Sequence, residues 1–298
     1  MHRLRPYQRG YVVSFSWADP TFHPVSFVLV LGLFAWYHET TSRSASSATR
    51  GQKRCFVLGL LALLLATTWP IVDLAHSVSL LVLVFQREIL VLAAAPLLLI
   101  GLPKMVMARL TRPPIIDAVV TRIITPIRAL VATTLLLGLT GLPFAVTWAS
   151  ESHFADAVMI LLTLLAGFIL WLPVVDRVPG VTPLGPLGKG AYLFAQSLAP
   201  TFLSFAWIFA LRPLYPSLQH QQHVLGLTPL GDQQLSGYLA KLGTFGVLWI
   251  VAFIFFFKAP DEEPEENTKP LHWIDVERSL ERAERREKRG YDERTLPG

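Results

Sequence analysis

The chain has 298 residues, of which 52% are hydrophobic and only 16% are charged, and its formal net charge is +5. The charged residues lie almost entirely outside long apolar runs, which excludes an ordinary soluble domain that spreads charge over its whole surface. Because membrane orientation by itself produces an excess of basic residues, we expect no nucleic-acid partner.

The apolar runs, at roughly 17 residues or more, are long enough to cross the hydrocarbon core of a bilayer as helices. Seven such runs lie near Thr21–Tyr37, Cys55–Val72, Leu74–Gly101, Pro126–Ser150, Phe154–Val175, Ala191–Tyr215 and Gln234–Phe257. We therefore expect an all-α polytopic membrane protein, in which residues 1–258 form a bundle of seven transmembrane helices.

Both ends of the chain differ from this apolar part. The first 20 residues contain no apolar core and predict no cleavable signal peptide. Residues 259–298 begin as a linker rich in proline and acids and continue as a charged helix, in which Glu281 and Arg285 have the i,i+4 spacing. We expect a solvated cytoplasmic tail, and a docking site for a partner is the alternative.

Positive charge in the loops predicts the orientation. The loops after the first, third and fifth predicted spans are basic, whereas those after the second and fourth contain no lysine or arginine. The positive-inside rule places the basic loops in the cytoplasm, so the N-terminus lies outside and the C-terminus lies in the cytoplasm. Arg3, Arg5 and Arg9 in the N-terminal arm oppose this orientation.

Histidines and acids collect at the predicted outer ends of the helices. Asp73 and His76 are three residues apart, as are His153 and Asp156, so each pair shares one helix face. Imidazole and carboxylate are ligands of copper and zinc, which makes these four residues candidate metal ligands. Two alternatives stay open: histidines that ligate a haem or handle protons, and polar residues that merely suit the wet interface. Cys55, the only cysteine, excludes a thiolate-pair metal motif or a disulfide framework.

Gln86, Arg87 and Glu88 interrupt the third predicted span. At about 1.5 Å rise per residue, Arg87 and Glu88 lie near mid-membrane, where a charge that faces lipid costs several kcal/mol. Both should face the bundle, and because consecutive residues point about 100° apart, they should not share one neighbour. Arg87 falls on the same face of this expected helix as His76, and Lys241 is the candidate partner of Glu88. Such a network either specifies helix packing or serves a function.

Three segments carry a resemblance to a known family. They are FQREILVLAAAPLLLIGLP from Phe85, HFADAVMILLTLLAGFILWLPVVD from His153 and RPLYPSLQHQQHVLGLTPLGDQQLSGYLAKLG from Arg212. The most specific part is the motif of Pro229, Leu230, Asp232, Gln233, Gln234 and Gly237. Together they resemble the CtaG family of bacterial cytochrome c oxidase assembly proteins, which are seven-helix membrane proteins linked to copper-dependent oxidase maturation. The resemblance covers about Val72 to Lys258.

The third predicted span departs from the family's pattern. Family members commonly carry His-Met-x-x-His there, and the corresponding residues in this chain are Leu83, Val84 and Arg87. If that pattern touches copper in the family, the contact is lost here or has moved to His76, because a guanidinium repels a cation. The resemblance implies oxidase biogenesis, while the missing ligands weaken copper handling as the mechanism.

The resemblance implies a multi-pass protein of the bacterial cytoplasmic (inner) membrane whose partners are lipid and oxidase subunits. It would assist assembly of a haem–copper oxidase and handle copper at the outer face. The alternatives are a metal-free accessory or structural partner of the oxidase, and a small transporter that uses Arg87, Glu88 and Lys241. No Ser/His/Asp or zinc-hydrolase motif is present in the sequence, so we expect neither catalytic residues nor an enzyme.

Overall fold

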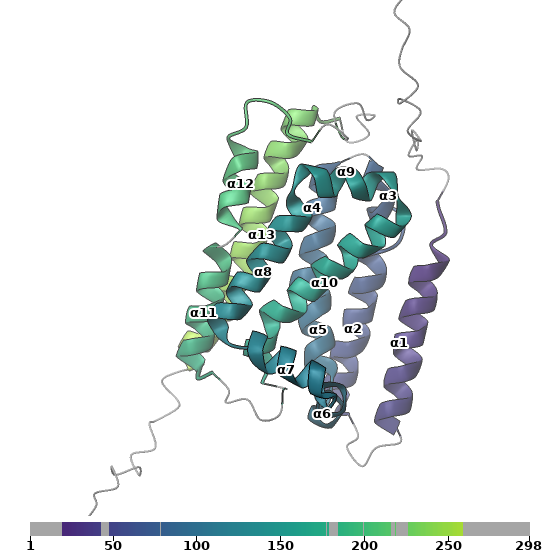
Figure 1. Cartoon of the computed structure of the whole chain (residues 1–298), viewed down its shortest axis with the longest axis vertical. Coiled ribbons are helices and arrows are strands. Elements are labelled where there is room, and N and C mark those ends of the chain that lie inside the picture. Colours follow the sequence, from purple (N-terminus) through teal and green to yellow (C-terminus); the bar gives the residue numbers. More distant parts are fainter. Residues whose placement is uncertain are drawn as a thin grey trace, which may run out of the picture. The chain divides into compact units, whose positions relative to one another are not determined.

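The computed structural model describes residues 20–42, 48–77, 79–176, 178, 184–198, 200–215, 218 and 226–258, apart from the side chains of residues 76, 77 and 258. Every regular element of this described part is a helix (Figure 1). The chain divides into two compact units, Met1–Phe256 and Phe257–Gly298. The linker and tail helix predicted for residues 259–298 lie outside the described residues.

The helices confirm a protein with several candidate membrane spans. In the part of the chain that is described, four helical stretches are long and apolar enough to cross a bilayer: Leu80–Gly101, His153–Val175, Pro186–Ile208 and Pro229–Phe257. A fifth is reached only if Pro114–Ile123 and Pro126–Gly141, which meet at a bend of 96°, form one span. Seven spans and the orientation of the termini therefore stay predictions.

The third predicted span is not one helix. α3 (Ile71–Ser77) ends before α4 (Leu80–Glu88), which continues through the π-helical segment η2 (Ile89–Ala94) into α5 (Ala95–Gly101). Ser79 has an extended backbone, and its hydroxyl accepts a hydrogen bond from the Val82 N–H at 3.3 Å, so it is the N-cap that starts α4. The expectation that His76 and Arg87 share a face of one helix is therefore wrong, because this cap separates two helices.

Proline breaks the fourth predicted span. α8 (Pro126–Gly141) ends before Leu142, which is extended, and α9 (Pro143–Glu151) begins at Pro143. Proline lacks an N–H and fixes φ near −65°, so it suits the first position of a helix and ends the hydrogen-bond ladder before it. α11 (Pro186–Leu198) and α12 (Thr201–Ile208), with Pro200 directly before α12, together make up the candidate span Pro186–Ile208, which corresponds to the sixth predicted run.

The remaining helices match the other predicted runs or fall in a predicted loop. α1 (Pro24–Ser42), α2 (Arg50–Ala66), α10 (His153–Val175) and α13 (Pro229–Lys258) correspond to the first, second, fifth and seventh runs. α6 (Lys104–Thr111) and α7 (Pro114–Ile123) occupy the stretch predicted as a loop between the third and fourth spans. They lie at the end of the bundle opposite to α3 and α9 (Figure 1).

The core forms where α2 packs on η2 and α5, and where α10 packs on α5 and α8. Glycine allows this close approach: a Cβ on Gly101 would lie 2.6 Å from Cβ of Phe56, and one on Gly167 would lie 2.8 Å from Cβ of Ala95. Small residues are the usual means by which helices approach closely in lipid. The Trp171 indole N–H also donates to the Val91 carbonyl within η2 at 2.8 Å, which joins α10 to the irregular turn.

Candidate functional site

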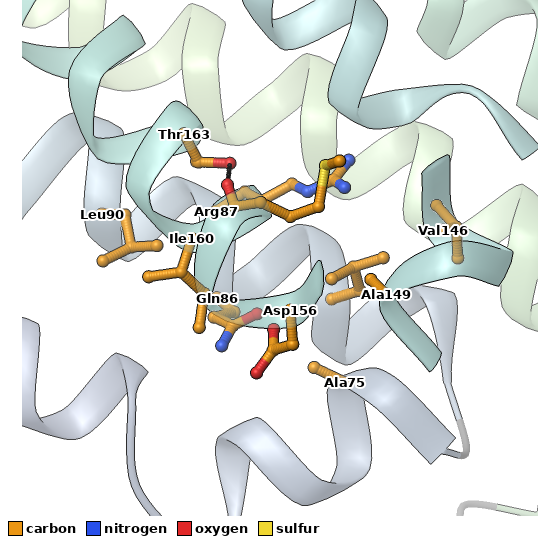
Figure 2. A pocket seen from close by; sticks show the side chains of 11 residues that line it. Ala75, Gln86, Arg87, Leu90, Val146, Ala149, Asp156, Ile160 and Thr163 are labelled. Carbon is orange, nitrogen blue, oxygen red and sulfur yellow. Dashed lines mark hydrogen bonds between the residues drawn. The ribbon is translucent and has the colours of Figure 1, made fainter. Parts of the chain in front are cut away.

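A pocket lies between α3, α4, α9 and α10, and its polar lining comes from Gln86, Arg87, Asp156 and Thr163 (Figure 2). The rest of the lining is apolar. The pocket is small: the volume open to the centre of a water molecule is about 10 Å³, which is close to the minimum for one bound water. The pocket joins residues that the sequence placed in separate sets, because Asp156 was a candidate metal ligand and Gln86 and Arg87 belonged to the intramembrane network.

Arg87 caps the carboxyl end of α8. Its Nη2 donates to the Thr140 carbonyl at 2.5 Å. The neighbouring carbonyl, of Gly141, accepts from the Tyr215 hydroxyl at 2.6 Å, and this hydroxyl accepts from the Trp207 indole N–H at 2.7 Å. The last carbonyls of a helix lack intrahelical partners and carry the negative end of its dipole, so a cation there is stabilised. The guanidinium therefore supplies a hydrogen bond to a carbonyl that the break between α8 and α9 leaves without an intrahelical partner.

Gln86 has the same role at the carboxyl end of α2. It is 1% exposed, and its Nε2 donates to the carbonyl of Ala66, the last residue of α2, at 2.8 Å. The next carbonyl, of Thr67, accepts from the Ser26 hydroxyl of α1 at 2.8 Å. Side chains from two other helices thus donate hydrogen bonds to the end of α2.

Glu88 contacts α13. The Thr244 hydroxyl donates to Oε1 of Glu88 at 2.8 Å, and Gly243 leaves room for the carboxyl group, because a Cβ there would lie 3.1 Å from Oε2. Oε2 is buried and has no hydrogen-bond partner among the described residues. Because Arg87 reaches α8 and Glu88 reaches α13, the prediction that the two side chains do not share a neighbour is confirmed.

The prediction that Lys241 is the partner of Glu88 is wrong. Lys241 donates to the Thr201 hydroxyl of α12 at 2.5 Å and lies 5.2 Å from the ring centre of Phe245. The Lys241 ammonium therefore contacts α12 and the Phe245 ring. Glu88 instead accepts a hydrogen bond from Thr244, which lies on α13 as Lys241 does. The depth of a residue along a helix, which the sequence supplied, does not determine which side of the helix its partner lies on.

Asp232 in the specific motif caps the amino end of α4. Its Oδ1 accepts from the Ser79 hydroxyl at 2.5 Å and its Oδ2 accepts from the Leu80 N–H at 2.7 Å. A carboxylate at this end of a helix satisfies free N–H groups and complements the positive end of the dipole. This explains why the motif contains an acid, and it joins the starts of α4 and α13.

The rest of the motif docks α13 on the α12 region. Gln233 accepts from the Leu214 N–H at 2.7 Å, and Gln234 donates to the Ala210 carbonyl at 3.3 Å. A Cβ on Gly237 would lie only 2.8 Å from the Ser204 carbonyl oxygen. The motif begins with Pro229 and Leu230 in the first turn of α13. Its polar residues therefore act as helix docking contacts in this structure.

The candidate metal ligands lie on different sides of α3. Oδ1 of Asp73 is 3.0 Å from Nε2 of His23, and Asp73 also accepts from the Thr21 hydroxyl. Ala75 of the same helix lines the pocket that contains Asp156. Residues two positions apart point about 200° apart on a helix, so Asp73 faces away from this pocket. The sequence alone could not reveal the contact with His23, because 50 residues separate it from Asp73.

The two remaining candidates do not complete a metal site in the described part of the structure. His153 is exposed at the start of α10, and the side chain of His76 lies outside the described residues. Among the side chains that are described, no group of three or more His, Cys, Asp or Glu residues is arranged to hold a metal ion.

A family model described as cytochrome c oxidase caa3 assembly factor (Caa3_CtaG) matches residues 27–260 of the chain. The matched stretch contains the whole pocket and the motif of α13, while His23 and Thr21 lie before it. No curated protein and no solved structure matches the chain.

Proposed function

Because the chain belongs to the cytochrome c oxidase caa3 assembly factor family, we propose that it assists the maturation of a haem–copper cytochrome c oxidase in the bacterial inner membrane. The match over residues 27–260, which contains every helix that lines the pocket, carries this proposal. The role requires no bond-making chemistry, so we propose a non-catalytic factor whose partners are lipid and oxidase subunits.

We propose that two residues of the pocket, Gln86 and Arg87, together with Asp232 outside it, keep the broken helices in one arrangement that an oxidase subunit can recognise. Gln86, Arg87 and Asp232 each satisfy the end of a different helix, so the arrangement of α2, α4 and α8 depends on them. A transport path is supported less well, because Arg87, Glu88 and Lys241 contact three different helices and form no connected chain.

Copper handling is the second candidate, and the pair of His23 and Asp73 is the observation that favours it. Two ligand atoms that share one metal ion at about 2.0 Å lie about 3 Å apart, and Nε2 of His23 is 3.0 Å from Oδ1 of Asp73. His76 follows Asp73 by three residues on α3. The pocket itself suits a copper ion poorly, because the guanidinium of Arg87 repels a cation. Copper as cargo would therefore bind where α1 meets α3.

Metal analysis of the detergent-purified full chain after copper loading and washing tests this candidate. We expect about one copper ion per chain in the natural protein and loss of that copper in a His23→Ala/His76→Ala variant. His38→Ala is the matched control, because His38 is an exposed histidine near the other end of α1. Absence of copper from all three proteins would overturn copper handling and leave the assembly role standing.

Deletion of the gene tests the assembly role itself. We expect loss of assembled oxidase activity, with restoration by the natural chain. Partial rescue by added copper would support copper handling, whereas stoichiometric co-purification with the mature oxidase and no rescue by copper would support the metal-free accessory role. A normal amount of active oxidase in the deletion strain would overturn the proposed function.

A further inference from the structure

α7 has an apolar face that the rest of the described chain leaves uncovered. None of its residues is fully buried. Val120 and Ile123 pack against the core, but Ile115 is 79% exposed and Val119 is 49% exposed. Ile115 and Val119 are four residues apart and therefore lie on one face, while Thr121 points about 200° away from Val119. The helix thus has a core-facing side, an exposed apolar side and a polar side.

The direction of α7 differs from that of the helix that follows it. α7 and α8 meet at a bend of 96° (Figure 1). α8 is apolar and packs along α10, which is a candidate span. If α8 follows the membrane normal, α7 lies in the plane of the membrane surface. A helix that is apolar on one side and polar on the other is suited to that position.

Basic residues lie within α6 and α7, between them and after them in the chain. Residues 104–128 contain five lysines and arginines and a single acid, Asp117. All five of these side chains are exposed: Lys104, Arg109, Arg112, Arg122 and Arg128. The guanidinium of Arg128 donates to the Arg122 carbonyl at 3.2 Å, which holds the start of α8 against the end of α7.

We propose that α6 and α7 form an interfacial segment that binds the anionic phospholipid headgroups of the bilayer. Ile115 and Val119 would enter the boundary between headgroups and acyl chains, and the basic side chains would extend to the phosphates. Juxtamembrane lysines and arginines are attracted to an anionic leaflet, and this attraction decays over a Debye length. The charge of the segment favours lipid as the occupant of this face over a second copy of the same positive surface.

Fluorescent labels on the two sides of α7 test the position of the helix. The full chain with Cys55→Ser carries one new cysteine, Val119→Cys or Thr121→Cys, in nanodiscs of phosphatidylcholine with 30% phosphatidylglycerol. We expect brominated acyl chains to quench the Val119→Cys label and aqueous iodide to quench the Thr121→Cys label. Iodide quenching of both labels would overturn the proposal, and so would shielding of the Val119→Cys label from both quenchers, because that result means a protein covers α7.

Lipid binding to the detergent-solubilised full chain tests the headgroup contact separately. Native mass spectrometry can compare phosphatidylglycerol with phosphatidylcholine at low salt. We expect Arg122→Gln to weaken phosphatidylglycerol binding roughly fivefold, with little change for phosphatidylcholine. Arg212→Gln, which removes an exposed arginine after α12, is the control and should change neither. An equal preference of Arg122→Gln and the natural chain for phosphatidylglycerol would overturn the headgroup contact.

Discussion

The polar residues of α4 are tolerated inside an apolar helix because each of them makes a hydrogen bond to another helix. Gln86 and Arg87 donate to carbonyls at helix ends, and Glu88 accepts from the Thr244 hydroxyl. Backbone groups in a bilayer cannot turn to water, so a broken span needs side chains that replace the missing hydrogen bonds. Arg87 supplies them to α8 and Gln86 supplies them to α2. The interruption of α4 by polar residues and the breaks in its neighbours are therefore one structural feature.

Replacement of Gln86 by leucine removes the donor to the Ala66 carbonyl and leaves this carbonyl buried without its partner. Such a loss costs about 1–3 kcal/mol, so we expect the free energy of unfolding to fall by that amount in a dodecyl sulfate titration of the detergent-purified protein. Thr134→Val is the control, because Thr134 is exposed and bonds only within its own helix, and it should change stability by less than about 0.5 kcal/mol. Equal effects of the two substitutions would contradict the capping role of Gln86.

Replacement of Asp232 by asparagine removes the negative charge and one of the two acceptor oxygens at the amino end of α4. We expect a loss of about 1–2 kcal/mol in the same titration, because both the cap and the dipole contact weaken. Glu151→Gln removes an exposed acid at the end of α9 and should have little effect. A stable Asp232→Asn variant would show that the motif's acid does not hold α4 to α13.

At the scale of the helices, close packing rests on glycines placed where two backbones meet. Gly59 faces the Leu98 backbone nitrogen, and a Cβ there would lie 2.9 Å from it, while Gly237 faces the Ser204 carbonyl. Backbone atoms cannot rotate away as the end of a side chain can, so these positions exclude even alanine without movement of a whole helix. Helix breaks and helix contacts together determine where α12 and α13 lie.

Two glycines of α13 offer a matched comparison. A Cβ at Gly237 would lie 2.8 Å from the Ser204 carbonyl oxygen, whereas a Cβ at Gly246 would have no atom within 4 Å. We expect Gly237→Ala to destabilise the protein by about 1–3 kcal/mol and Gly246→Ala to stabilise it by about 0.5–1 kcal/mol, because alanine favours the helix. Thermal unfolding of the two variants in neutral detergent checks this. A similar shift in both would show that α12 and α13 do not approach closely at Gly237.

For the whole molecule, the number of crossings is the property that remains a prediction. The described helices supply four or five candidate spans, and neither α1 nor α2 is among them. α2 nevertheless packs along η2 and α5 with little room between the backbones. Such packing favours a crossing by α2, since a helix that lies along a membrane span experiences the same apolar surroundings.

Cysteine labelling in spheroplasts tests the predicted crossings between residues 46 and 151 and their orientation. In a Cys55→Ser background, we expect an impermeant maleimide to label Glu151→Cys from outside and to reach Ser46→Cys and Lys104→Cys only after permeabilisation. Ser46 lies between α1 and α2 in the chain, so labelling of Ser46→Cys from outside together with Glu151→Cys would contradict the predicted crossing by α2.

The sequence by itself determined the class of structure: long apolar runs require helices in a membrane, the depth of Arg87 and Glu88 requires them to face the bundle, and the motif from Pro229 to Gly237 indicates the family. Tertiary structure alone decided which groups meet where the helices break. Asp232, 153 residues away in the chain, completes the cap at Ser79, and Arg87 donates to the Thr140 carbonyl, 53 residues away. Hydrophobic periodicity is a local property, and a hydrogen bond between distant residues leaves no trace in it.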